Sequence, residues 1–260
     1  MKILPFIFMT LLPLIAQTYA QAEIKTQVVE YRDGDTVLEG YLAYDETVKG
    51  KIPAVLIVHE WTGLGSYMKK RAEQIAGLGY VAFAIDIYEK GIRPTNNEDA
   101  AKQASIYRQD RQLMRRRALA GLEKVKKFPS VDAKRIAAMG YCFGGGVVLE
   151  MARSGADLKG VVSFHGNLDT PHPEDAKNIK AKVLICHGAD DHYVTGEQVL
   201  AFENEMRAAH VDWQMNIYGN SVHSFTNPDS GNDSSKGAAY NQQADMRSWE
   251  AMRAFFKEIF

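Results

Sequence analysis

The most reactive side chain of this sequence is Cys142, which lies in the run Gly-Tyr-Cys-Phe-Gly-Gly at residues 140–145. The apolar residues 135–139 before it predict a short buried strand, and residues 147–153 after it predict an amphipathic helix. A sharp turn from strand to helix needs small residues, because its apex is strained and the helix must approach the strand closely. We therefore expect Cys142 at the apex of such a turn, where its thiol is a candidate nucleophile.

A thiol nucleophile needs a base, and that base needs an acid that fixes its tautomer. His223 follows the last predicted strand and is the candidate base. The candidate acid lies in the turn at residues 188–194, where Asp190 and Asp191 both follow an earlier predicted strand. Spacing alone leaves the choice between these two carboxylates open.

An oxyanion formed on an attacked carbonyl needs two backbone N–H donors. Phe143 is expected to supply one, because it follows the nucleophile at the start of a helix whose dipole also favours a thiolate. The loop at residues 59–65 is expected to supply the other, and Trp61 is the candidate. Glu60 is then placed near the thiol, where it can accept or release a proton. Two alternatives stay open: Trp61 only lines the pocket, or Glu60 forms a surface salt bridge.

Four further histidines lie near predicted strand ends, so a metal site has to be considered: His59, His165, His187 and His192. No spacing such as His-Glu-x-x-His places two of them on one helix face. We therefore expect no metal and no other cofactor.

The segments that must position these residues alternate between strands and helices. Residues 24–31 and 36–44 alternate apolar and polar side chains around Asp-Gly-Asp, which predicts an antiparallel hairpin. Buried strands are predicted at residues 53–59, 80–86, 135–139, 159–165, 182–187 and 213–218. Helices are predicted at residues 67–78, 97–127, 147–153, 196–209 and 246–256, the second of them either continuous or broken near Gln109.

This alternation predicts an α/β fold with a mostly parallel, doubly wound sheet and helices on both faces. Functional sites of such sheets lie at the carboxyl ends of the strands, and each candidate residue above falls at such an end. With 260 residues, 46% of them hydrophobic, the chain is long enough for one large core, and we predict a single domain over residues 23–260.

The formal net charge of −1 argues against binding to nucleic acid, which requires a strongly basic surface. The three consecutive arginines at residues 115–117 are the one basic cluster, and we expect them on the solvated face of a helix.

The first 22 residues predict a secretory signal peptide: Lys2, an apolar run at residues 3–16, and small residues near Ala20 and Ala22. The apolar run is short for a membrane span. We expect cleavage after Ala22, with Ala20 as the second choice, and a periplasmic or secreted protein that does not contact the membrane. An uncleaved anchor is the alternative.

The chain has only two cysteines, which excludes a disulfide-dense scaffold. Cys186 lies within a predicted buried strand and is expected to be a small core residue. A bridge between Cys142 and Cys186 is the weaker alternative, because it would inactivate the nucleophile.

Taken together, these motifs resemble those of the dienelactone hydrolase family, whose members have the α/β-hydrolase fold. The resemblance rests on residues 53–64, 86–88, 140–145, 188–194 and 223–225. The order nucleophile, acid, histidine along the chain is the one expected of that fold.

The resemblance implies that a Cys-Asp-His triad opens esters and lactones through an acyl-enzyme. Carried over by motif, this triad is Cys142, Asp191 and His223. Glu60 matches the glutamate that holds the resting cysteine in the family and takes part in its activation.

The sequence departs from the family at the substrate pocket. Members of the chlorocatechol pathway bind the substrate carboxylate with two arginines, and Lys90 and Asn227 occupy the matching positions here. These side chains do not support bidentate recognition of a carboxylate. With Arg93, which is placed to compensate, they are the candidate substrate-binding residues, and we expect neutral or weakly anionic substrates.

The sequence therefore predicts an exported hydrolase that cleaves a small carboxylic ester or lactone. The expected oligomeric state is a monomer or weak homodimer. Three alternatives use the same features: a thioesterase or acyltransferase with this triad, a catalytically silent periplasmic binding protein, and a redox-sensing thiol.

Overall fold

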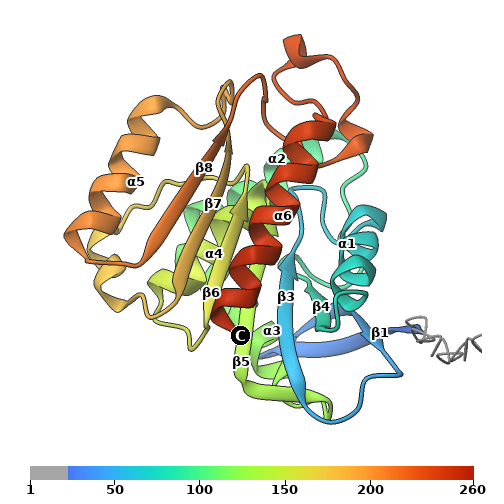
Figure 1. The fold of residues 1–260 in the computed structure, drawn as a ribbon. Helices are drawn as coiled ribbons and strands as arrows, with labels where there is room; N and C mark the ends of the chain where they lie inside the picture. Colours follow the sequence, from blue (N-terminus) through green and yellow to red (C-terminus); the bar gives the residue numbers. More distant parts are fainter. Residues whose placement is uncertain (1–22) are drawn as a thin grey trace, which may run out of the picture.

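The computed structural model describes residues 23–260, so the predicted signal peptide lies outside the described residues, and cleavage and export stay predictions. One eight-stranded sheet with the order β1-β2-β4-β3-β5-β6-β7-β8 forms the centre of the fold (Figure 1). Its strands are β1 (Ile24–Asp33), β2 (Thr36–Asp45), β3 (Ile52–Val58), β4 (Val81–Ile85), β5 (Val131–Tyr141), β6 (Gly160–Phe164), β7 (Lys182–Gly188) and β8 (Trp213–Tyr218). Only β1 and β2 run antiparallel to their neighbours, which confirms a mostly parallel sheet.

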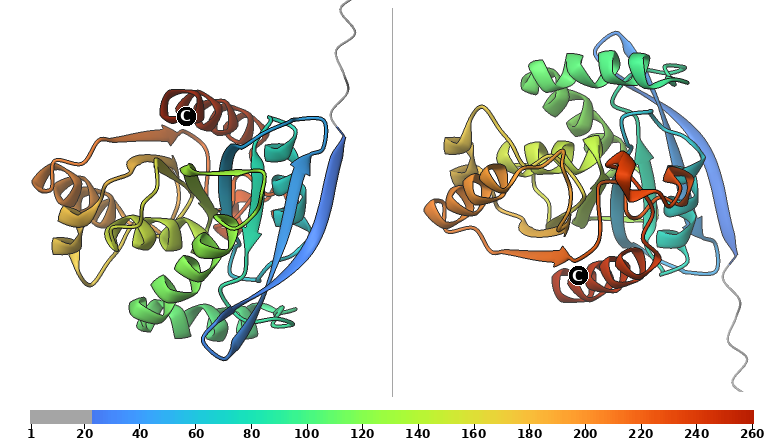
Figure 2. Two further views of the ribbon diagram at one scale, coloured as in Figure 1. Left: turned by 90° about the horizontal axis from the view of Figure 1, so that it is seen from below. Right: turned by 90° about the horizontal axis from the view of Figure 1, so that it is seen from above.

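Within the described part of the chain there are six α-helices, and they cover the two faces of the sheet (Figure 2). They are α1 (Ser66–Ala76), α2 (Asn97–Gln109), α3 (Arg111–Val125), α4 (Phe143–Arg153), α5 (Gly196–Ala208) and α6 (Gln242–Ile259). Short 3₁₀ turns occur at Pro173–Asn178, Pro228–Ser230 and Ser234–Lys236. Within residues 23–260, no helix combines the length and the apolar character that a membrane crossing requires.

The predicted helix over residues 97–127 is broken into α2 and α3 at Asp110. Its backbone lies outside the helical region, at φ −114° and ψ 84°. Its carboxylate accepts a hydrogen bond of 2.8 Å from the backbone N–H of Leu113 and so caps the start of α3.

Two apolar clusters, one on each face of the sheet, bury its central strands. Leu56 of β3 belongs to the cluster that α2, α3, α4 and α5 cover. Val55 and Ile57, the neighbours of Leu56, point to the opposite cluster, which α1 and α6 cover. Since β3 is buried on both faces, its continuous apolar sequence is what this position requires.

The expectation of a solvated face for the arginines at residues 115–117 is wrong for two of them. Arg115 and Arg117 are 7% and 5% exposed. Arg115 pairs with Glu150 of α4 at 2.7 Å, and Arg117 pairs with Asp33 at the end of β1 at 3.0 Å. Consecutive helical residues point in different directions, so here two of the three meet acidic groups on packed elements.

Cys186 is a buried residue of the core, as predicted, and both cysteines are free thiols. Burial raises the pKa of the Cys186 thiol to about 12, although the hydroxyl of Tyr218 contacts its Sγ at 3.8 Å. Cys186 is therefore a protonated core residue at neutral pH.

The connection from β5 to α4 is tight enough to require glycine. A side chain at Gly140 would overlap the backbone of Gly144, and one at Gly144 would overlap the backbone of β3 at Val58. These approaches allow α4 to begin directly after the strand and to pack against it.

We expect Gly140→Ala to lower the free energy of unfolding by about 3 kcal/mol, because the added methyl group has no space. Gly219→Ala is the matched control, since nothing lies within 4 Å of the position of its added methyl group. Urea denaturation measures both. Equal stability of Gly140→Ala and the wild type would contradict the packing described here.

Candidate active site

Cys142 lies at the turn between β5 and α4, with φ 53° and ψ −116°. This conformation is strained for any residue with a side chain. Its backbone N–H donates to the carbonyl oxygen of Phe164 at 3.0 Å and to Nδ1 of His165 at 3.1 Å. The side chain is 6% exposed, so the thiol is nearly enclosed yet reachable.

His223 and Asp191 form a buried hydrogen-bonded pair. His223 Nδ1 lies 2.8 Å from Asp191 Oδ2, and the other carboxylate oxygen accepts the N–H of Tyr193 at 2.9 Å. Asp190 is exposed. The structure thus pairs Asp191, and not Asp190, with the imidazole.

The surroundings of His223 favour its protonated form. Burial alone would lower the pKa of His223, but attraction to Cys142 and the hydrogen bond to Asp191 raise it to about 10. At neutral pH the protonated form of His223 is therefore favoured.

Glu60 follows β3 and is 8% exposed. Asn227 Nδ2 donates a hydrogen bond of 2.7 Å to Glu60 Oε2. Burial raises the pKa of Glu60 to about 7, and the hydrogen bond from Asn227 only partly offsets this. The structure thus gives Asn227 a contact with Glu60, and its contact with substrate stays a prediction.

Of the two predicted oxyanion donors, Phe143 directly follows Cys142, and Trp61 lines the same cavity as Cys142. Within residues 23–260, the backbone N–H groups of both residues lack a hydrogen-bond partner. The hydroxyl of Tyr88 donates to the carbonyl oxygen of Trp61 at 2.8 Å and so holds the peptide that follows the Trp61 N–H. Both N–H groups are therefore free to bind an oxyanion.

His59 holds the loop that contains Glu60 and Trp61. Its Nε2 accepts the backbone N–H of Ile87 at 3.1 Å, so the ring proton lies on Nδ1 and is donated to the carbonyl oxygen of Glu60 at 2.6 Å. The ring stacks on Phe143 with a centroid distance of 5.9 Å. His59 therefore holds the Glu60 loop in place and is not free to bind a metal.

His165 links Cys142 to the loop that carries His223. Its Nδ1 accepts the N–H of Cys142, so its Nε2 carries the proton and donates to Thr226 Oγ1 at 2.7 Å. Burial holds the pKa of His165 well below its usual range, and the ring packs edge-on against His223 at 5.2 Å. His165 is a neutral positioning residue whose role the sequence did not reveal.

Thr226 is held in turn by α1 and α6. The hydroxyl of Tyr67 lies 2.8 Å from both oxygens of Thr226, and Arg71 Nη2 donates to its carbonyl oxygen at 2.9 Å. The same guanidinium pairs with Asp245 of α6. A continuous polar chain therefore runs from α6 to the backbone of Cys142.

Within residues 23–260, no three His, Cys, Asp or Glu side chains are grouped so that they could hold a metal ion together. Two of the histidines considered as ligands, His59 and His165, have both ring nitrogens engaged as described above.

The structure does not bring the three predicted substrate-binding residues together. Lys90 pairs with Glu30 on β1. Arg93 donates to the carbonyl oxygens of Leu64 and Ile92 at 3.1 and 2.7 Å and stabilises the loop after β4. Their positive charges are thus engaged in contacts within the protein.

A cavity of about 270 Å³ is lined by both Cys142 and His223. Its lining residues are Trp61, Arg108, Cys142, Asn167, Tyr193, His223, Ser224 and Ala238. Arg108 and Asn167 were missed from the sequence, because an arginine on an exposed helix and an asparagine in a loop carry no distinguishing signal. The cavity joins side chains from the loops after β3, β6, β7 and β8 to the start of α4 and the end of α2.

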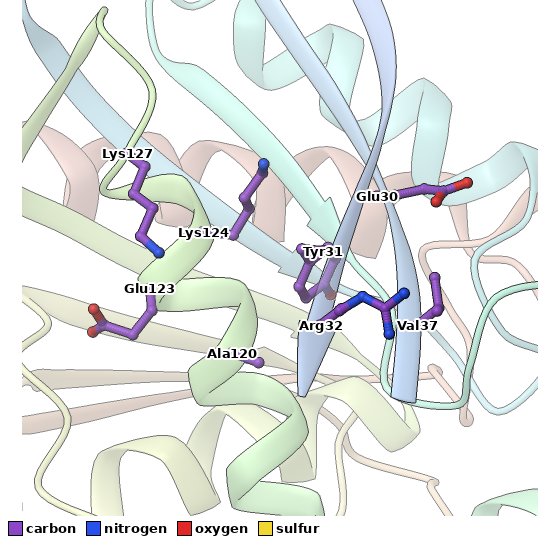
Figure 3. A pocket seen from close by; sticks show the side chains of 8 residues that line it. All are labelled: Glu30, Tyr31, Arg32, Val37, Ala120, Glu123, Lys124 and Lys127. Carbon is purple, nitrogen blue, oxygen red and sulfur yellow. The ribbon is translucent and has the colours of Figure 1, made fainter. Parts of the chain in front are cut away.

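A larger groove, of about 450 Å³, lies between the N-terminal hairpin and α3 (Figure 3). Its lining residues are Glu30, Tyr31, Arg32, Val37, Ala120, Glu123, Lys124 and Lys127. Figure 3 shows their charged groups pointing in different directions. This larger groove has no nucleophile and no convergent polar groups. The smaller cavity at Cys142 is therefore the candidate active site.

The raised pKa of Glu60 predicts how stability changes with pH. The folded protein keeps the Glu60 proton between pH 4.5 and about 7, whereas the unfolded chain releases it. The stability of the wild type should therefore fall relative to Glu60→Gln as pH rises through this window, by about 3 kcal/mol in total. Denaturation at pH 4.5 and 7.5 measures the difference, with the exposed Glu98→Gln as control. A pH-independent difference would contradict the buried, protonated Glu60.

The contacts of His165 predict an effect on the nucleophile. His165→Phe removes both hydrogen bonds while it keeps a ring in place, so we expect kcat to fall at least about 10-fold with a smaller change in KM. Alkylation of Cys142 by iodoacetamide should slow in the same variant, which a purely structural residue would not cause. The exposed His172→Phe is the control. Unchanged alkylation in folded His165→Phe would exclude the positioning role.

Comparison with known proteins identifies the family of this chain. The model of the dienelactone hydrolase family matches residues 38–260. A solved structure named m3DLH is 42% identical with a TM-score of 0.88, and the match covers 91% of this chain and 99% of that one. A dienelactone hydrolase-like promiscuous phosphotriesterase from metagenomic libraries is 39% identical with a TM-score of 0.86 and the same coverage.

Among curated proteins, the probable 2-oxo-3-(5-oxofuran-2-ylidene)propanoate lactonase of Bradyrhizobium sp is 26% identical over 212 residues, which are 77% of this chain and 85% of that protein. The chain therefore belongs to the dienelactone hydrolase family, has the α/β-hydrolase fold, and is a dienelactone hydrolase-like hydrolase.

Proposed function

We propose that the protein cleaves a carboxylic ester or lactone through an acyl-enzyme on Cys142. The observation that carries this proposal is the buried His223–Asp191 pair, 2.8 Å between Nδ1 and Oδ2, whose His223 lines the same cavity as the strained Cys142. A nucleophile and a base in one cavity, with an acid that orients the base, are the parts that acyl transfer requires.

In the acylation step, the Cys142 thiolate attacks the carbonyl carbon and the carbonyl electrons move onto oxygen. The N–H groups of Phe143 and Trp61 stabilise this oxyanion. As the intermediate collapses, the carbon–oxygen bond of the ester breaks, and the His223 imidazolium gives its Nε2 proton to the leaving oxygen. The products are a thioester on Cys142 and an alcohol, which stays attached to the acyl group when the substrate is a lactone.

In the deacylation step, the now neutral His223 takes a proton from water, and the resulting hydroxide attacks the thioester. Collapse of the second intermediate expels the thiolate and releases the carboxylic acid. Asp191 holds the imidazole in the tautomer that both steps need and stabilises its charge. Glu60, whose pKa lies near neutrality, can accept or release one further proton beside the reacting groups.

We expect Cys142→Ala to lower kcat for 4-nitrophenyl acetate and for a neutral lactone by at least about 1000-fold. Asp191→Asn should lower kcat by about 1000-fold or more, because the wrong imidazole tautomer is then favoured. Asp190→Asn is the matched control and should behave like the wild type, since Asp190 is exposed. Full turnover by Cys142→Ala, or equal losses in the two aspartate variants, would contradict the proposal.

A further inference from the structure

The reaction cavity contains one cation that the proposed chemistry does not use. Arg108 lies at the end of α2 and lines the cavity together with Cys142 and His223. Its guanidinium lies over the ring of Phe143, 5.9 Å from the centroid. Its Nη2 donates a hydrogen bond of 3.0 Å to Asn167 Oδ1 in the loop after β6. Two elements remote in sequence thus hold its guanidinium at the cavity.

Arg108 differs from the arginines that follow it in the fold. Arg111, Arg115 and Arg117 each pair with a carboxylate within 3.0 Å. No carboxylate in residues 23–260 lies within ion-pair distance of Arg108, and none of the residues described as lining the cavity is acidic. The charge of Arg108 is therefore available to a ligand.

The position of Arg108 relative to the reacting atoms suits recognition of substrate. The ring of Phe143 contacts the guanidinium of Arg108, and the backbone N–H of Phe143 is the proposed oxyanion donor. Arg108 therefore packs on a residue that contacts the reacting carbonyl. A cavity of about 270 Å³ admits only a small molecule. In a substrate bound with its carbonyl group at Cys142, a group remote from that carbonyl can then lie close to the guanidinium of Arg108.

We propose that Arg108, positioned by Asn167, is a specificity-determining residue that binds a carboxylate carried by the substrate. A guanidinium offers parallel N–H donors that match the two oxygens of a carboxylate. This inference rests on the proposed ester or lactone hydrolysis and adds the charge of the substrate to it. It also replaces the expectation of neutral substrates, which depended on Lys90 and Asn227 and did not include Arg108.

Two matched ester pairs test this inference. The first pair is mono-(4-nitrophenyl) glutarate and 4-nitrophenyl pentanoate, with the carboxylate on the acyl side. The second pair is 4-acetoxybenzoate and its methyl ester, with the carboxylate on the leaving group. The wild type should prefer the charged member of at least one pair by about 10-fold or more in kcat/KM, the expected strength of a charge-assisted hydrogen bond.

Arg108→Gln should reduce this preference to about one, through KM more than kcat, and Arg108→Lys should keep part of it. Lys102→Gln removes a positive charge from the same helix away from the cavity, where Lys102 pairs with Glu98, and should leave the preference unchanged. No preference in either pair, or the same preference in Arg108→Gln, would overturn the inference.

Alkylation of Cys142 provides a readout that does not depend on ester turnover. Iodoacetate and iodoacetamide differ only by a carboxylate in place of an amide, so the ratio of their rates reports the charge that Arg108 adds to the cavity. This ratio should fall several-fold in Arg108→Gln and stay constant in Lys102→Gln. If no ester is turned over, the proposed function fails and the ratio alone decides the inference: a fall supports it, and an unchanged ratio overturns it.

Discussion

The active site depends on one strained peptide segment, the turn at Cys142 between β5 and α4. A non-glycine residue at φ 53° costs on the order of 1–3 kcal/mol and persists only where its surroundings fix it. Here the N–H of Cys142 is held by Phe164 and His165, and the glycines on either side allow strand and helix to touch. The strain directs the thiol into the cavity at the start of a helix.

The other residues of the site lie in loops that directly follow buried strands of the sheet. Glu60, Asp191 and His223 follow β3, β7 and β8, so the parallel sheet brings their loops to one edge. The polar chain from Asp245 through Arg71 and Thr226 to His165 then ties this edge to α1 and α6. The positions of nucleophile and base are thereby coupled through buried hydrogen bonds.

Much of this arrangement could be predicted because it depends on residues that are close together in the sequence. Buried strands have continuous apolar sequences. The glycines around Cys142 predict the turn without any information on distant parts of the chain. The choice of Asp191 over Asp190 came only from the resemblance, since side-chain direction at a turn is not a property of spacing. The roles of these residues in catalysis stay predictions.

The sequence could not reveal contacts that depend on which distant side chains meet. The ion pair between Lys90 and Glu30 of the N-terminal hairpin is one such contact, and binding of substrate by Lys90 stays a prediction. Arg115 and Arg117 were expected in solvent, but packed acids neutralise them. His165 and Arg108 looked like an ordinary strand-end histidine and a surface arginine until the fold placed them beside Cys142.

The most direct test of the account is to identify the covalent intermediate. His223→Gln protein, which lacks the base needed for deacylation, is mixed with 4-nitrophenyl acetate, quenched in acid and mapped by mass spectrometry. The account predicts one acetyl group on Cys142. Ester turnover by the wild type without any acyl group trapped on Cys142, or with the acyl group on another residue, would contradict it.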